Sequence, residues 1–198
     1  MAVALGAVAA FLLGSVNPAT IVARVLGRDL ATAGSGNPGA TNAGRVLGAR
    51  WGVLVGLLDV AKGFVPSVLA LHLGGHGASY VVGVAAVLGH VWSPFLRGHG
   101  GKGVATALGA VLGVLPWFAL VMVVVFVAVV ALGRWVAGAS VAAAGTLVVL
   151  GVLAGLGRTG PLGGVGWSTT AYGVVLSGVV LARHRPNLQG WSRARRSR

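Results

Sequence analysis

The sequence is almost without acidic residues and has no cysteine. Asp29 and Asp59 are the two carboxylates among 198 residues. Metal-assisted hydrolysis usually needs several acidic ligands, so we expect no metal and no cofactor. A serine hydrolase needs an acid to orient its histidine, and the Gly-x-Ser-x-Gly turn that often carries the serine is absent here. Without cysteine there are no disulfides and no thiolate chemistry, and the redox compartment stays undetermined.

Charge of either sign is scarce, at 9% of residues, whereas 56% are hydrophobic and the mean hydropathy is +0.91. That composition is typical of a membrane protein and not of a soluble domain. Thirty-five glycines suit the close approach of helices in lipid. There is no low-complexity linker, so we expect one all-α membrane domain over residues 1–198.

The charge that is present is mostly basic, with a net charge of +13. Such an excess can indicate nucleic-acid binding. Here most of the basic residues lie in short loops beside apolar stretches, which the positive-inside rule explains better. We therefore expect no nucleic-acid partner.

The apolar stretches predict membrane helices. They cover residues 2–25, 51–71, 80–96, 104–115, 116–132, 136–156 and 168–182. Residues 1–13 lack a basic region, which favours a first transmembrane helix over a cleaved signal peptide. Residues 104–115 are short for a span, and form either a tilted helix in a thinned region or a re-entrant one. Counting this segment gives seven transmembrane helices, with the N-terminus outside and the C-terminus in the cytoplasm.

Residues 34–45, Gly-Ser-Gly-Asn-Pro-Gly-Ala-Thr-Asn-Ala-Gly-Arg, form a polar, glycine-rich island in the apolar chain. Its glycines and Pro38 exclude a regular helix over residues 34–39. Successive open N–H groups form a concave anion site, and hydroxyl and amide side chains can extend it. Arg45 adds a planar fork suited to phosphate or carboxylate. We predict an anion-binding loop for phosphate; the alternative is a flexible connector between helices.

Two further polar islands follow later in the chain. Residues 89–106 carry a second run of glycines with His90, His99 and Lys102, and residues 183–190 contain His184 and Asn187. Under the seven-helix topology, all three islands are loops on the cytoplasmic face.

Asp59 and Lys62 lie three residues apart on one face of the second predicted span. Ionisable residues inside a span are costly and usually functional, so we predict a role in or beside the site. The alternative is a self-neutralising pair that only orients the helix. For His90, which stands before Pro94, the alternative is a cap or a hydrogen bond to a neighbouring loop.

The islands resemble the PlsY family of bacterial, integral-membrane, acyl-phosphate-dependent glycerol-3-phosphate acyltransferases. The resemblance covers the whole chain. It is carried by Gly14-Ser15, residues 34–45, Asp59 with Lys62-Gly63, Gly89-His90 with Pro94 and residues 98–106, and Arg183-His184 with Asn187. It implies a multi-pass protein of the bacterial inner membrane with its active site on the cytoplasmic face. It also implies transfer of an acyl group from acyl phosphate to the sn-1 hydroxyl of glycerol 3-phosphate. The products would be lysophosphatidic acid and phosphate, in phospholipid biosynthesis.

The resemblance implies a role for each matching residue. The phosphate of the acyl donor would lie against Ser35, Gly36, Asn37, Gly39, Ala40, Thr41 and Asn42. Arg45, Lys102 and Ser140 would hold the phosphate of glycerol 3-phosphate, and His184 and Asn187 would position its hydroxyls. Gly101 would belong to the substrate-binding set, with Asp59, Lys62 and His90 in support. The implied partners are the two substrates, membrane lipid and an enzyme that forms acyl phosphate and hands it over. The nucleophile would be the substrate hydroxyl.

Two departures from the family pattern stand out. The family's C-terminal Gly-x-Glu is replaced by Ala194-Arg195-Arg196, and Ala137-Gly138-Ala139 precede Ser140 where the family prefers a serine and a glycine. Two rival functions stay open. One is a membrane transporter of a phosphorylated anion. Transporters usually bind their substrate at the midplane of the membrane and not at one face. The other is a non-catalytic relative that binds lipid phosphate, as the altered tail suggests.

Overall fold

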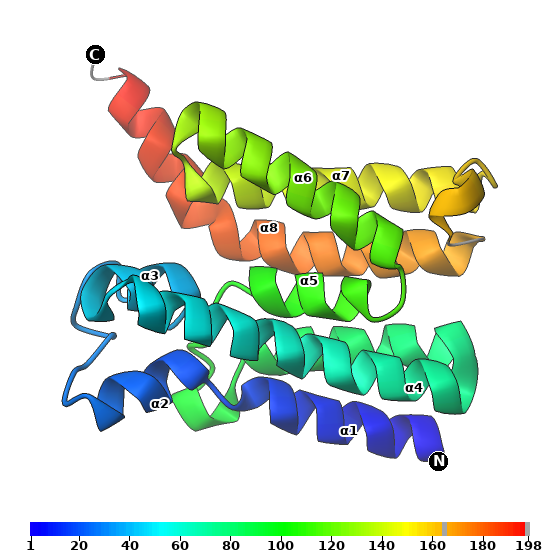
Figure 1. Cartoon of the computed structure of the whole chain (residues 1–198), viewed down its shortest axis with the longest axis horizontal. Helices are drawn as coiled ribbons and strands as arrows, with labels where there is room; N and C mark the ends of the chain where they lie inside the picture. Colours follow the sequence, from blue (N-terminus) through cyan, green and yellow to red (C-terminus); the bar gives the residue numbers. More distant parts are fainter. Residues whose placement is uncertain (164–165, 197–198) are drawn as a thin grey trace. The chain divides into compact units, whose positions relative to one another are not determined.

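The computed structural model describes residues 1–163 and 166–196, which contain helices and no strand. The chain divides into two compact units, Met1–Val114 and Leu115–Arg198. Figure 1 follows both from the N-terminus to the C-terminus. Each unit is described by itself below.

Unit 1 is built on α4 (Ala49–Val91), which is two helical arms joined at Gly75. Gly75 has φ 73° and ψ −170°, a conformation that residues with a side chain rarely adopt. Asp59 and His90 lie on different arms, yet their side chains are 3.4 Å apart. A straight helix would separate these two residues by roughly 46 Å, so the chain must fold back at Gly75. The helices predicted over residues 51–71 and 80–96 therefore extend toward each other and meet at the turn residue Gly75 (Figure 1).

Small residues let the other helices of unit 1 pack closely on α4. Ala10 of α1 (Ala2–Ser15) contributes to a buried cluster with Val82 and Ala86. On α5 (Val104–Leu112), a side chain at Gly109 would clash with the carbonyl oxygen of Val60. In lipid the hydrophobic effect does not drive helices together, so close backbone packing of this kind stabilises their association instead.

Three short elements complete unit 1. They are α2 (Pro18–Val25), α3 (Ala40–Leu47) and the 3₁₀ turn η1 (Pro94–Leu96). The predicted helix over residues 2–25 is two helices, because Val16 and Asn17 adopt extended conformations. Pro18 then stands at the first position of α2, where its missing N–H costs nothing.

Unit 2 consists of α6 (Pro116–Gly133), α7 (Val136–Gly155), the 3₁₀ turn η2 (Gly160–Leu162) and α8 (Trp167–Arg196). Ser177 Oγ donates to the Ala144 carbonyl at 2.8 Å, which ties α8 to α7. Helix α8 runs on through Pro186, so the third polar island is helical and not the loop that the sequence predicted. The last two residues of the basic tail, 197–198, lie outside the described residues.

In the described chain, four helical stretches are long and apolar enough to cross a membrane. They are Ala2–Val25, Ala49–Leu96, Pro116–Gly133 and Val136–Gly155. Helix α5 is short, as predicted, and its nine residues span roughly 14 Å against ~30 Å of hydrocarbon. The count of seven crossings and their orientation stay predictions.

Candidate functional site

The loop before α3 is shaped round the side chain of Asn42, which belongs to the predicted anion site. Its Oδ1 accepts a hydrogen bond from Ser35 N at 2.8 Å, and its Nδ2 donates to the carbonyls of Ala33 at 3.1 Å and Leu30 at 3.4 Å. Asn42 is 1% exposed. The Asn42 amide therefore stabilises the conformation of the loop. Its contact with substrate stays a prediction.

Residues 40–45 belong to helix α3 and not to the loop that the sequence predicted. The helix changes which backbone N–H groups of the predicted anion site, called the cradle below, are open to a ligand. Internal hydrogen bonds already engage the N–H groups of Ser35, Gly36, Gly39, Asn42 and Ala43. Among the described residues, those of Asn37, Ala40 and Thr41 have no such acceptor. Gly39 is the N-cap of α3 and has no side chain to cap the helix. The partial positive charge at the start of α3 is therefore not neutralised by a capping side chain. The candidate cradle is thus smaller than predicted and is supported by a helix dipole.

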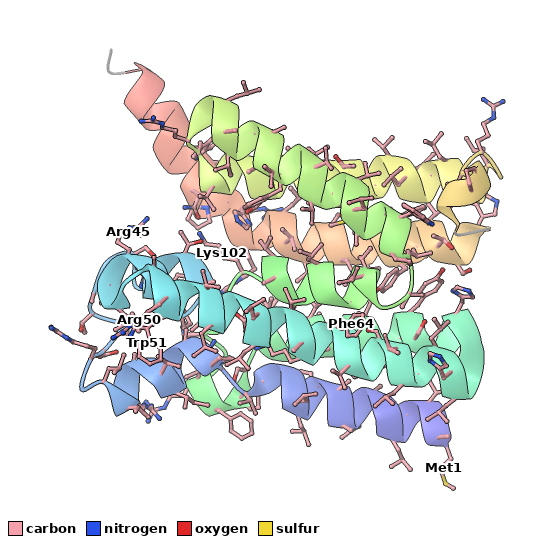
Figure 2. The ribbon with its side chains drawn as sticks, in the orientation of Figure 1. Met1, Arg45, Arg50, Trp51, Phe64 and Lys102 are labelled. Atoms are coloured by element: carbon pink, nitrogen blue, oxygen red, sulfur yellow. The ribbon has the colours of Figure 1, made fainter. Side chains whose placement is uncertain are left out.

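Two of the predicted basic residues also belong to unit 1. Arg45 is exposed in the last turn of α3, and Lys102 is half-buried just before α5. Figure 2 shows both toward the end of the unit that lies away from Met1. Gly101 N donates to the His90 carbonyl at 3.1 Å, and any side chain at Gly101 would press into the His90 ring. The position of Lys102 is therefore fixed against the end of α4.

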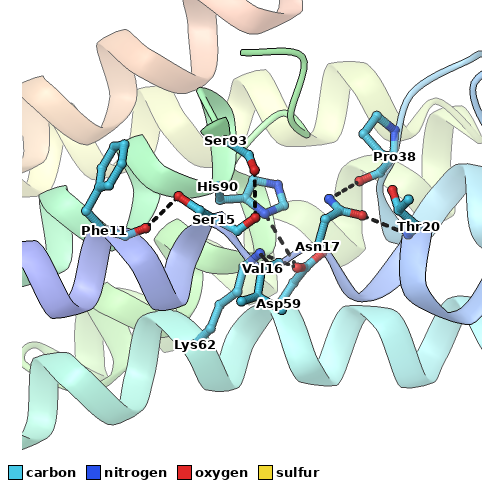
Figure 3. Close-up of polar contacts among 10 residues, drawn as sticks. All are labelled: Phe11, Ser15, Val16, Asn17, Thr20, Pro38, Asp59, Lys62, His90 and Ser93. Atoms are coloured by element: carbon cyan, nitrogen blue, oxygen red, sulfur yellow. Dashed lines mark hydrogen bonds and ion pairs between the residues drawn. The ribbon is translucent and has the colours of Figure 1, made fainter. Parts of the chain in front are cut away.

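Unit 1 also contains a buried charge cluster (Figure 3). Asp59 Oδ1 is 3.0 Å from Lys62 Nζ and 3.4 Å from His90 Nδ1. The three residues are 2%, 6% and 4% exposed, so the charges are held away from solvent. Lys62 Nζ also donates to the Val16 carbonyl at 2.9 Å. The cluster therefore joins both arms of α4 to the break between α1 and α2.

The break between α1 and α2 is held by polar side chains that the sequence did not assign to the site. Ser93 Oγ donates to the Ser15 carbonyl at 2.7 Å (Figure 3). Asn17 Oδ1 caps α2 by accepting from Thr20 N at 2.8 Å, and Asn17 Nδ2 donates to the Pro38 carbonyl at 2.9 Å. Freed backbone groups are costly in lipid, so each needs such a partner. The available signal was the polar Ser15 and Asn17 inside an apolar stretch.

The remaining predicted residues lie in unit 2. Ser140 Oγ donates to the Val136 carbonyl at 2.9 Å within α7. On α8, His184 Nδ1 lies 2.8 Å from the Val180 carbonyl, which can only accept, and Asn187 is exposed. The prediction that Ser140, His184 and Asn187 share one site with the residues of unit 1 stays a prediction.

Long apolar helices and an open cradle of N–H groups with nearby basic side chains define a helical membrane protein with a candidate anion site. The family model described as glycerol-3-phosphate acyltransferase matches residues 4–193, and the chain belongs to that family. The glycerol-3-phosphate acyltransferase of Desulforudis audaxviator is 39% identical over 95% of this chain and 91% of its own. That of Aquifex aeolicus is 38% identical over 90% of each chain.

Solved structures support the same assignment. The chain is similar to a crystal structure of PlsY, an integral membrane glycerol 3-phosphate acyltransferase, in its glycerol 3-phosphate form. The TM-score is 0.89 at 35% identity, with 98% of this chain and 94% of the other covered. The lysophosphatidic acid form gives 0.87 at 34% identity over the same shares. The protein is therefore an acyltransferase of lipid biosynthesis and an integral, multi-pass membrane protein.

The bond from Asn17 to Pro38 leads to a first testable expectation. Because the loop is predicted to bind the donor's phosphate, replacing Asn17 with alanine should raise the KM for the acyl donor about tenfold, the size of one lost hydrogen bond to the loop. Steady-state kinetics with varied donor measure this. Asn17→Ser keeps an acceptor for the α2 cap but is too short to hold Pro38. Both variants should share the raised KM, and a normal KM in Asn17→Ser would contradict the loop-holding role.

Proposed function

We propose that the protein transfers an acyl group from acyl phosphate to the sn-1 hydroxyl of glycerol 3-phosphate, which yields lysophosphatidic acid and inorganic phosphate. The observation that carries the proposal is the cradle of open N–H groups at Asn37, Ala40 and Thr41, at the start of α3. A helix N-terminus with open donors favours a phosphate group. The names of the relatives, and the ligands named for the two PlsY structures, support the acceptor and the product.

In this proposal the cradle holds the donor's phosphate, and basic side chains hold the acceptor's phosphate. Arg45, Lys102 and Ser140 hold the acceptor's phosphate, while His184 and Asn187 position the glycerol hydroxyls. The hydroxyl oxygen attacks the carbonyl carbon, and the bond from that carbon to the phosphate oxygen breaks with its electron pair on the phosphate. The hydroxyl proton passes to a substrate phosphate. Fixed N–H donors and cations stabilise the charge that develops on the carbonyl and on the leaving group.

The reaction needs no carboxylate from the protein, and both carboxylates are engaged elsewhere. Asp59 is buried in its ion pair with Lys62, and Asp29 accepts a hydrogen bond from Ala31 N at 2.8 Å. A mechanism with a substrate phosphate as the base is therefore consistent with this chain.

We also propose the topology in which this chemistry takes place. The seven crossings would be α1, the two arms of α4, α5, α6, α7 and α8, in the bacterial inner membrane. The N-terminus would lie outside, and the donor would be handed over at the cytoplasmic face by an enzyme that forms acyl phosphate. The basic residues near α2, α3 and the end of α8 support this orientation.

The decisive experiment supplies purified protein with glycerol 3-phosphate and, in separate reactions, acyl phosphate or the corresponding acyl thioesters. We expect lysophosphatidic acid and phosphate in equal amounts from acyl phosphate, with the acyl chain at sn-1 by NMR. Lys102→Ala should abolish the reaction, and Arg134→Ala, an exposed arginine after α6, should not. Turnover with thioesters alone would overturn the donor assignment. No turnover together with anion uptake into vesicles would favour a transporter.

A further inference from the structure

Unit 1 contains a pocket of about 480 Å³ that the proposed reaction does not use. It lies against α2, the loop that follows α2, and the segment after α4. Its ionisable lining residues are Arg24, Arg28, Asp29 and His99. Neither Arg45 nor Lys102 lines it, and the three residues with open N–H groups do not line it either. Of the residues predicted to hold the donor's phosphate, Gly36 alone lines it, so the pocket adjoins the anion loop but does not contain the open N–H groups of the cradle.

The end of α2 brings both arginines to this pocket. Gly27, with φ 65°, follows the last turn, and its N–H donates to the Arg24 carbonyl at 3.0 Å. The Arg28 N–H then donates to the Ala23 carbonyl at 2.8 Å. These two bonds form the Schellman motif, in which a left-handed glycine turns the chain back on the helix end. The turn at the end of α2 thus places Arg24 and Arg28 at the same pocket.

The charges of the pocket fit a phosphodiester that also carries hydroxyl groups. Two arginines against one aspartate leave one positive charge on these side chains, apart from His99, which matches the single negative charge of a diester. Guanidinium groups bind phosphate oxygens through paired N–H donors. The Asp29 carboxylate would repel the dianion of free phosphate, and it can accept hydrogen bonds from hydroxyl groups of the ligand.

The surroundings of the pocket are apolar and exposed, as expected at a bilayer surface. On α2, Ile21 is 50% exposed and Val25 is 80% exposed. In the segment after α4 that contains the lining residue Leu96, Trp92 is 46% exposed and Phe95 is 64% exposed. Basic and aromatic residues mixed with aliphatic ones are typical of the interface between headgroups and acyl chains.

We propose that this pocket binds the headgroup of an anionic membrane phospholipid with hydroxyl groups, of the phosphatidylglycerol type. Arg24 and Arg28 hold the phosphodiester, Asp29 accepts from the headgroup hydroxyls, and the acyl chains lie along the exposed faces of α2 and Phe95. Gly36 and Pro38 of the anion loop form part of the pocket wall. A bound lipid would therefore contact the loop from outside the catalytic cradle.

The test measures binding and needs no turnover, so its failure is distinct from failure of the proposed function. Delipidated protein in detergent is offered deuterated phosphatidylglycerol, phosphatidylethanolamine, phosphatidylcholine or inorganic phosphate, and retained ligand is counted by native mass spectrometry. Phosphatidylglycerol should bind best. The double variant Arg24→Gln, Arg28→Gln should weaken its binding about twenty-five-fold, a factor of about five for each arginine. Arg134→Gln with Arg158→Gln makes the same charge change on exposed arginines in unit 2 and should have no effect.

A second variant separates the lipid from free phosphate. Asp29→Asn keeps the oxygen that accepts from Ala31 N but removes the negative charge. It should admit inorganic phosphate, because the carboxylate that repels the phosphate dianion is gone. Equal retention by the double arginine variant and the wild type would overturn the proposal. So would tighter binding of inorganic phosphate than of phosphatidylglycerol by the wild type, or equal binding of all three lipids.

Discussion

Replacing Arg45 with alanine is expected to lower kcat/KM for glycerol 3-phosphate by about 10²- to 10³-fold, the loss typical of one charge-stabilising donor. Arg45 is exposed in the last turn of α3, and its side chain forms no ion pair among the described residues. Its guanidinium is therefore available to a substrate phosphate. Initial rates with varied acceptor and saturating donor measure the loss, and most of it should fall on the acceptor.

Arg50 provides the matched control. It is also exposed, lies at the start of α4, and its guanidinium sits 5.1 Å from the centre of the Trp51 ring. Arg50→Ala removes the same charge from the same part of unit 1, so a general electrostatic effect would appear in both variants. Kinetics for Arg50→Ala should stay near those of the wild type. Unchanged acceptor kinetics in Arg45→Ala would remove this arginine from the proposed site.

The helices that the sequence predicted best are those with uninterrupted apolar runs. For α6 and α7 the predicted ends lie within one residue of the observed ones. Helix α3 was not predicted, because its sequence is polar and rich in small residues. It is stabilised by tertiary packing, with Ala43 fully buried and Gly44 against Gly52 of α4. Local composition carries no signal for packing of that kind.

The predicted residues of the site were easier to choose than their arrangement. Ionisable residues inside an apolar span identify Asp59 and Lys62 as candidates, and a polar island identifies His90. That Asp59 meets His90 depends on the turn at Gly75 and on how the two arms of α4 align. The bond between Asn17 and Pro38 depends on how the break after α1 faces the loop. Neither fact follows from spacing, because each joins segments whose separation in space the tertiary fold decides.

Replacing Lys62 with methionine is expected to lower the free energy of unfolding by about 3–5 kcal/mol, the cost of leaving one buried charge without its partner. Asp59 would keep only His90 near its carboxylate, and the Val16 carbonyl would lose its donor. Thermal and denaturant unfolding in detergent measure the change.

The double variant Asp59→Asn, Lys62→Met separates the ion pair from the other contact of Lys62. Removing both charges should recover most of the stability lost in Lys62→Met, because a buried pair contributes little beyond what a neutral pair of similar size would contribute. If the double variant is as unstable as the single one, the bond from Lys62 to the Val16 carbonyl carries the stability instead. Turnover per folded molecule should fall far less in the double variant than in Arg45→Ala, because the cluster holds the helix break and the proposed substrate contacts lie elsewhere. A loss as large as that of Arg45→Ala would instead place Asp59 and Lys62 in direct contact with the reacting groups.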